Sequence, residues 1–187
     1  MDQNSFYIFQ NNNFVDLGLY QCGWEKCKSG HLFGPTTRSH YLFHYVIHGK
    51  GCLWANGPKG DKNIFTISAG QGFMIFPGQI KTYFADEENP WEYTWMEFDG
   101  LKVKEALDLT TLTLETPVYA PSDRKAADLL LQEMQFITHG SAQPAFSIIG
   151  HLFIWFSHLM ASCRRPGIVR RERLCDYYIK EAISFIE

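Results

Sequence analysis

Three histidines recur at every fourth position, His40, His44 and His48, and histidine is a common metal ligand. Side chains alternate between the two faces of a β-strand, so all three would lie on one face. At roughly 3.3 Å per residue they would be spread over about 26 Å, which is too far for one ion to bind all of them. A metal shared by the three is therefore excluded. We expect one of them, with His44 as the candidate, to face a ligand pocket or the core.

The sequence contains only part of a second arrangement of metal ligands, which is found in some β-barrels. Some metal-binding β-barrels combine a His-x-His pair and a glutamate with a further histidine that follows a Pro-Gly turn. The turn is present at Pro77-Gly78, but Lys81 occupies the place where the histidine is needed. The sequence therefore predicts no metal in the barrel and no other cofactor.

Two of the five cysteines, Cys22 and Cys27, form a C-x4-C pair with His31 nearby. Structural zinc sites use four ligands at tighter, paired spacings, so we interpret these two cysteines as half-buried structural thiols. An odd number of cysteines also fits a reducing compartment better than a disulfide framework. We therefore expect a cytoplasmic protein.

Aromatic residues give the clearest chemical signal. Trp91, Tyr93 and Trp95 alternate onto one face of a strand, and Tyr83 lies one hairpin earlier. Such rings stack against the C–H faces of sugars, while the tyrosine hydroxyl and the indole N–H supply directional hydrogen bonds. The alternative is that each ring only packs the core. As a group the rings favour a ligand pocket, because side chains this large leave gaps when they line a small barrel.

Patterns typical of catalysis are missing from the sequence. It contains no activated serine or cysteine arrangement, no phosphate-binding glycine loop and no close acidic pair. We therefore predict no catalytic residue, and a protein that binds a ligand without transforming it.

The elements that would position the rings lie between His40 and Gly100, where short apolar runs alternate with Gly, Pro and Asn. This pattern predicts β-strands joined by tight turns, in a small antiparallel sandwich or barrel. After Leu101 the apolar period becomes helical. We expect helices at about 121–139, capped by Ser122 or Asp123, and at 145–163. Their apolar stripes indicate either core faces or a dimerisation layer.

The two ends of the chain differ from this central part. Residues 1–20 resemble an extended N-terminal arm, and residues 164–173, with Pro166, Gly167 and five arginines, are typical of a linker. Residues 174–187 resume a helical pattern that reaches Glu187 without a cap. We expect this last segment to be a truncated helix of a further domain.

Composition limits the classes of partner. The formal net charge of −3 gives no overall basic field for nucleic acid, and 45% hydrophobic residues can form a sizeable core. Polar residues interrupt the most apolar helical stretch, which argues against a membrane span. They are Ser147, His151, Ser157 and His158.

Several motifs together resemble one family. The chain contains YQCGWEKC, HLFGPTTR, YLFHYVIHGKG, GQGFMIFPGQIKTYFAD and PWEYTWMEFDG in this order. The series is similar to the N-terminal effector-binding domain of AraC/XylS-family transcription regulators, especially the group that governs uptake of α-galactosides and other oligosaccharides. The resemblance implies a mainly β fold with C-terminal helices: a cupin-like jelly-roll barrel of residues 21–163 that includes two dimerisation helices. It also implies a C-terminal domain with two helix-turn-helix units, of which residues 174–187 resemble the first helix.

The resemblance also implies particular site residues. It places Tyr83 and Trp95 at sugar-contacting positions, with Tyr93 replacing a polar pocket residue. The arginine that anchors sugar in the arabinose-responsive member has no match here, and Arg38 lies a few positions away. With His44 and Trp91, these residues form the expected ligand site.

Two hypotheses follow for the function. The first is the ligand-sensing and dimerisation domain of a regulator that responds to a mono- or oligosaccharide and reaches operator DNA through the C-terminal domain. The second is a small cupin enzyme, such as a sugar isomerase or dioxygenase. Lys81 and the missing His-x-His pair favour the regulator.

Overall fold

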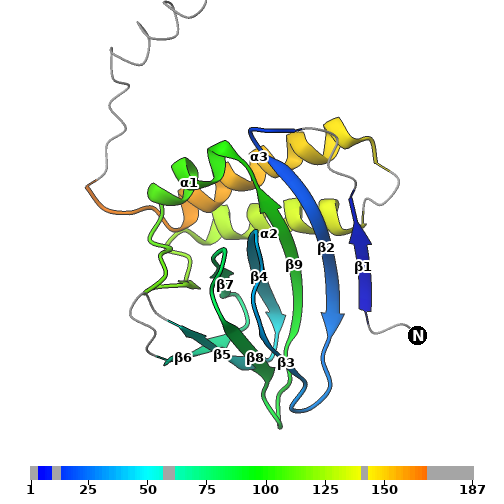
Figure 1. Cartoon of the computed structure of the whole chain (residues 1–187), viewed down its shortest axis with the longest axis vertical. Helices are drawn as coiled ribbons and strands as arrows, with labels where there is room; N and C mark the ends of the chain where they lie inside the picture. The colour runs from blue at the N-terminus through cyan, green and yellow to red at the C-terminus, as the bar shows by residue number, and fades with distance from the viewer. Residues whose placement is uncertain (1–3, 10–13, 57–61, 140–142, 168–187) are drawn as a thin grey trace, which may run out of the picture.

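Two β-sheets and three helices make up the computed structural model, which describes residues 4–9, 14–56, 62–139 and 143–167 (Figure 1). The larger sheet has six strands in the order β1-β2-β9-β4-β7-β10, and the smaller sheet has four in the order β3-β8-β5-β6. The larger sheet is built from β1 (Asn4–Ile8), β2 (Gly18–Lys26), β4 (Tyr41–His48), β7 (Gly72–Ile75), β9 (Glu92–Asp99) and β10 (Val118–Tyr119). The smaller sheet is built from β3 (Leu32–Thr36), β5 (Lys50–Asn56), β6 (Lys62–Ser68) and β8 (Lys81–Ala85).

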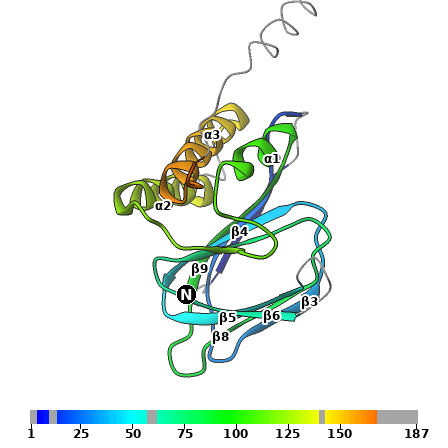
Figure 2. The same ribbon diagram turned by 90° about the vertical axis from the view of Figure 1, so that its left-hand side faces the viewer.

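The two sheets face each other, and the helices lie outside the larger one (Figure 2). Every pairing between the named strands is antiparallel. The helices are α1 (Leu101–Asp108), α2 (Arg124–His139) and α3 (Ala145–Ser162). The mainly β fold with C-terminal helices that the sequence predicts is therefore confirmed.

Strand β9 shows how one sheet separates two cores. Tyr93 belongs to the cluster of buried side chains between the sheets, and Trp95 packs against the same cluster. Met96 and Phe98 belong to a second cluster, which also contains the buried faces of α2 and α3. Because side chains alternate along a strand, a strand that is covered on both faces needs apolar residues at successive positions. This explains the nearly continuous apolar run of β4.

The helices form a layer over the outer face of the larger sheet. Helix α2 begins where the Asp123 carboxylate accepts a hydrogen bond from the Ala126 N–H at 3.0 Å, which is an N-cap at one of the two expected positions. The helices expected at about 121–139 and 145–163 correspond to α2 and α3, while α1 was not anticipated as a separate element. Gly140, the expected end of the first of these helices, lies outside the described residues.

By length and composition, α3 is apolar enough to cross a membrane. In the structure, its Ile148, Leu152 and Trp155 side chains are buried in the core beneath the helices. These buried side chains mean that α3 also fits the role of a core helix of a globular domain.

The two ends of the chain are described only in part. The expected arm of residues 1–20 contains β1, which pairs with β2 along its whole length, and the first residues of β2 itself. In the expected linker, the Arg165 N–H donates to the Leu109 carbonyl at 3.0 Å, just after α1. Residues 168–173 of that linker and the helix expected at 174–187 lie outside the described residues.

Candidate ligand-binding site

A cavity of about 290 Å³ lies between the two sheets and is lined on one side by residues of β1. Its apolar wall consists of Phe6, Trp24, Phe33, Leu42, Tyr83, Tyr93 and Trp95. Its polar groups come from Asn4, Ser5, Gln21, Glu25, Arg38 and His44. A pocket with mostly aromatic walls and a few convergent polar groups is typical of a small-molecule site.

Strand register places the Trp95 ring in this wall. Trp95 is paired with Gly23 on β2, and a Cβ atom at Gly23 would lie only 2.8 Å from Cζ2 of the indole. Glycine is therefore needed there for the ring to lie against β2. From β1, the Phe6 ring approaches the indole with a centroid distance of 5.5 Å.

Tyr83 forms the opposite part of the wall, from the smaller sheet. Its ring stacks on Phe33 at a centroid distance of 5.0 Å and meets His44 edge-on, also at 5.0 Å. Burial raises the pKa of the Tyr83 and Tyr93 phenols well above the ordinary tyrosine value. Both hydroxyl groups are consequently neutral at physiological pH, and each can donate a hydrogen bond.

His44 is held in place by rings on several sides. It stacks on Phe73 at 4.4 Å and meets Tyr93 edge-on at 5.0 Å. Burial, with smaller contributions from the positive charges of Lys81 and Arg38, keeps its pKa well below the usual value, so the imidazole is neutral. Its Nδ1 atom is buried and has no hydrogen-bond partner among the described residues. A buried polar atom without a partner is rare in folded proteins, and this one belongs to a residue that lines the cavity.

Arg38 points into the cavity and is fixed there by Glu97. Its Nη1 atom lies 3.0 Å from Oε2 of the Glu97 carboxylate. The same carboxylate contacts His40 Nδ1 at 3.1 Å and accepts a hydrogen bond from the Gln21 amide. The backbone around Arg38 is anchored as well, because its carbonyl accepts a hydrogen bond from the Gly78 N–H at 2.8 Å. The guanidinium group is thus positioned before any ligand arrives.

Lys81, at the position where metal-binding barrels have a histidine, is buried beside this network. Its Nζ atom has no hydrogen-bond partner in the described part of the chain. Burial, and to a smaller extent the charge of Arg38, lowers the pKa of its ammonium group to about 7, although Glu97 acts in the opposite direction. The lysine therefore adds a titratable group behind the cavity wall.

The structure brings five of the six predicted site residues to one cavity. Tyr83, Tyr93, Trp95, Arg38 and His44 all line it.

Trp91 does not line the cavity. Its indole is fully buried and packs over Gly51, where a Cβ atom would lie 2.4 Å from the ring. Trp91 is therefore a core residue that supports Tyr83 and Tyr93 from behind. This corrects the expectation that Trp91 contacts the ligand.

Gln21 and Glu25 also line the cavity, although the sequence did not predict them as site residues. Antiparallel pairing of β2 with β9 sets Gln21 opposite Glu97 and Glu25 opposite Tyr93. The Tyr93 hydroxyl then donates to Oε2 of Glu25 at 2.9 Å. Polar or small residues at alternate positions of the segment QCGWE were a signal for an inward polar face. The partners of those residues depend on the register, which the segment alone does not specify.

The C-x4-C pair is not brought together. Cys22 lies in the core beneath the helices, whereas Cys27 lies in the core between the sheets. Burial raises the pKa of each thiol to about 12. Both thiols are buried rather than half-buried as expected, and Glu25, not Cys22, is the residue grouped with Cys27 and His31.

Comparisons with known proteins identify the family of this chain. Residues 18–148 match the family model of the AraC-like ligand binding domain. The chain is 33% identical over 134 residues to the Msm operon regulatory protein of Streptococcus mutans, a match that covers 71% of this chain and 46% of that protein. It is 32% identical over 106 residues to the raffinose operon transcriptional regulatory protein RafR of Pediococcus pentosaceus, covering 56% of this chain and 37% of that protein.

Solved structures also match the chain. YhaK from Escherichia coli matches with a TM-score of 0.44 and 16% identity, over 52% of this chain and 44% of that one.

Proposed function

Because this chain belongs to the AraC-like ligand-binding domain family, we propose that it is the sugar-sensing and dimerisation module of a sequence-specific transcription regulator. The observation that carries the proposal is the cavity between the sheets, where aromatic rings and fixed polar groups surround one space. A regulator of this kind works inside the cell, where its promoter is.

A saccharide suits the chemistry of this cavity. Trp95, Tyr83 and Phe33 offer flat apolar faces for the C–H groups of a sugar ring. Arg38 and the neutral His44 offer donors and an acceptor for its hydroxyl groups. The volume of about 290 Å³ lies just below the range of about 300–1,000 Å³ that is usual for ligand pockets. This size favours a small saccharide over a long chain held entirely inside.

The names of the relatives narrow the class of sugar and favour a regulator over a small cupin enzyme. One relative is named as a raffinose operon regulator. We therefore place α-galactosides first among the candidate effectors of this chain, and the size of the cavity favours the smaller ones, such as the disaccharide melibiose, over the trisaccharide raffinose.

Thermal unfolding in the presence of saccharides tests the proposal. A ligand that binds only the folded state raises the melting temperature, by an amount that grows with its concentration relative to Kd. We expect raffinose or melibiose to raise the melting temperature of the wild-type chain, and Trp95→Ala to abolish the shift. Trp54→Ala is the matched control, because Trp54 is exposed on the smaller sheet and does not line this cavity.

Two results would contradict the sugar site. One is a screen of mono- and oligosaccharides in which no compound stabilises the wild-type chain. The other is a saccharide-dependent shift that survives Trp95→Ala in a variant whose circular dichroism matches that of the wild type.

The free face of α3 supports the dimerisation part of the proposal. Phe146, Phe153 and Ile154 are exposed on this helix, whereas the apolar stripe of α2 is buried against the sheet. Pairing about a two-fold axis is the commonest way to cover such a face. We therefore expect α3 to provide most of the interface between two copies of the chain.

The last part of the proposal concerns the recognition of operator DNA. The matched region of this chain covers less than half of each relative. Helix-turn-helix domains read base edges with a helix placed in the major groove. We propose that a C-terminal helix-turn-helix domain of the whole protein supplies it, and that sugar binding in the module described here controls that domain.

A further inference from the structure

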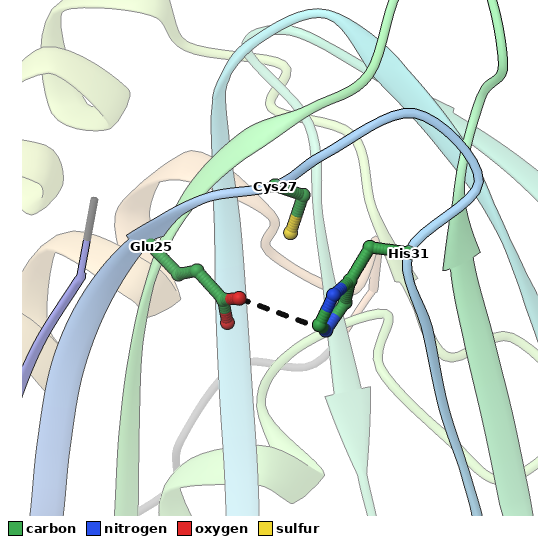
Figure 3. Close-up of side chains that lie close together, drawn as sticks. All are labelled: Glu25, Cys27 and His31. Atoms are coloured by element: carbon green, nitrogen blue, oxygen red, sulfur yellow. Dashed lines mark ion pairs between the residues drawn. The ribbon is translucent and has the colours of Figure 1, made fainter.

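We propose that Glu25, Cys27 and His31 form a Zn²⁺ site at the end of β2, separate from the position that metal-binding barrels use. The carboxylate, thiol and imidazole side chains converge on one space (Figure 3). One donor atom from each residue lies within 4.8 Å of the other two. The three residues are spaced Glu-x-Cys-x3-His, so the proposed site contains only one cysteine of the C-x4-C pair.

The distances are close to those of a coordinated ion. Zn²⁺ lies about 2.0–2.3 Å from nitrogen, oxygen and sulfur ligands in tetrahedral geometry, which sets neighbouring donor atoms roughly 3.3–3.8 Å apart. The His31 Nε2 atom already lies 3.6 Å from Oε1 of Glu25. The donor atom of Cys27 lies within 4.8 Å of those of the other two residues, so the sulfur has to approach by no more than about 1.5 Å to reach a coordinating separation.

The backbone that carries the ligands is fixed from both sides. The Cys27 N–H donates to the Trp91 carbonyl at 3.1 Å, and the His31 carbonyl accepts a hydrogen bond from the Ala85 N–H at 2.9 Å. Between them the chain makes a tight turn, in which the His31 N–H donates to the Lys28 carbonyl at 3.1 Å. Gly30 adopts φ +63° in this turn, a conformation that favours glycine. The site is therefore held in place without the ion.

A neighbouring group also orients the carboxylate. The Tyr93 hydroxyl donates to Oε2 of Glu25, which leaves Oε1 directed towards His31. Outer contacts of this kind position the ligands of metal sites and increase their affinity. Cys27 is buried, while the side chains of Glu25 and His31 are 26% and 37% exposed, so an ion can enter from solvent.

The donor set identifies the metal class. Thiolate, imidazole and carboxylate are all regular Zn²⁺ ligands, whereas Mg²⁺ and Ca²⁺ select oxygen donors. Three protein ligands leave the fourth tetrahedral position to solvent or a small molecule. The ordinary alternative is a histidine–glutamate ion pair beside a buried thiol. In that case Cys27 stays protonated at neutral pH, because burial raises its pKa to about 12.

Cobalt(II) binding distinguishes the two arrangements, because a cobalt–thiolate bond gives a charge-transfer band in the near ultraviolet. The reduced 187-residue chain is titrated with Co²⁺ in buffer without sugar, and Zn²⁺ is then added. We expect a band that saturates at one Co²⁺ per chain and disappears when Zn²⁺ displaces the cobalt. Cys27→Ser should remove the band, and His31→Ala should weaken binding at least about tenfold. Cys52→Ser, which changes a thiol outside the cluster, should leave the band unchanged.

Clear outcomes overturn the proposal: no thiolate band in the wild type, a band that persists in Cys27→Ser, or binding that is unaffected by His31→Ala. If Cys27→Ser fails to fold, Glu25→Gln and His31→Ala decide the question, because both change partly exposed side chains. Unchanged binding in both then contradicts the site. Since no sugar is present, failure here leaves the proposed sugar site untouched.

Discussion

At the scale of single residues, the unusual feature is a positive charge placed inside a mainly aromatic interior. Lys81 is only 1% exposed and its Nζ atom has no hydrogen-bond partner among the described residues. Arg38, Glu97 and His44 are the ionisable groups that interact with it. Removing a charge from water without a close partner costs free energy, and the folded protein reduces that cost by lowering the pKa of the ammonium group.

Replacing this lysine should change how stability depends on pH. In the wild type the pKa of Lys81 is about 7 in the folded state and about 10.5 in the unfolded chain. Between these values the unfolded chain binds more protons, so this group destabilises the fold fully below pH 7 and ceases to do so near pH 10.5. Lys81→Met removes the effect. We therefore expect the variant to be the more stable protein at pH 7, with an advantage that shrinks by up to about 1.4 kcal/mol per pH unit as pH rises.

Urea unfolding of both proteins between pH 6 and about 10 measures this difference. Lys125→Met is the control, because Lys125 is exposed on α2 and its charge stays in water. A stability difference for Lys81→Met that does not vary with pH would show that Lys81 titrates normally in the folded protein.

At the scale of elements, β1 connects the N-terminal segment to the cavity. It is the edge strand of the larger sheet and pairs with β2 alone. Asn4, Ser5 and Phe6 line the cavity, and the Phe6 ring contacts Trp95. A strand held by one neighbour is easier to displace than a central strand. We propose that β1 closes over the bound sugar.

Removal of residues 1–13 should therefore weaken sugar binding more than it weakens the fold. We expect the truncated chain to keep its circular dichroism and to show a smaller saccharide-dependent rise in melting temperature. Phe6→Ala should give part of this loss. Ile8→Ala should not, because Ile8 is exposed on the same strand and does not line the cavity. Saccharide stabilisation equal to that of the wild type after the truncation would exclude β1 from the site.

At the scale of the whole molecule, the helical layer leaves one apolar surface uncovered. Phe146, Phe153 and Ile154 of α3 are exposed. A groove is lined by Ala106 of α1, by Leu109 just after it, and by Phe153 and Phe156 of α3. Exposed apolar patches of this kind mark interaction surfaces. The apolar stripes of the two expected helices indicated either core faces or a dimerisation layer, and the stripe of α2 is a core face.

A charge on α3 should therefore break the dimer. We expect the wild-type chain to be a dimer by size-exclusion chromatography with light scattering, and Phe153→Asp or Ile154→Asp to give monomers with an intact fold. The control is Gln132→Asp, which places the same charge on the exposed polar face of α2. A dimer that withstands both α3 substitutions would mean that the two copies meet through another surface.

Local features of this protein followed from the sequence by itself. The alternation of Tyr93 and Trp95 onto one strand face and the helical stripe that became α2 both depend on the geometry of a few consecutive residues. These periodicities arise from backbone dihedral angles, so they are encoded in each short segment. The same rule explains why Cys22 and Cys27 separate: Cys22 lies in β2, Cys27 directly follows it, and residues an odd number of positions apart along an extended chain point to opposite faces. The separation of Cys22 and Cys27 could therefore be predicted from the sequence, although the C-x4-C spacing suggested that they form a pair.

Only the tertiary structure decided which distant groups meet. The orientation of Arg38 depends on Glu97, 59 positions away, and the grouping of Glu25 with Tyr93 depends on the register between β2 and β9. Whether a ring lines the cavity, as Trp95 does, or supports it from behind, as Trp91 does, depends on what the opposite sheet places against it. Such contacts are determined by pairing register and by packing between segments far apart in the chain, and no local pattern specifies either one.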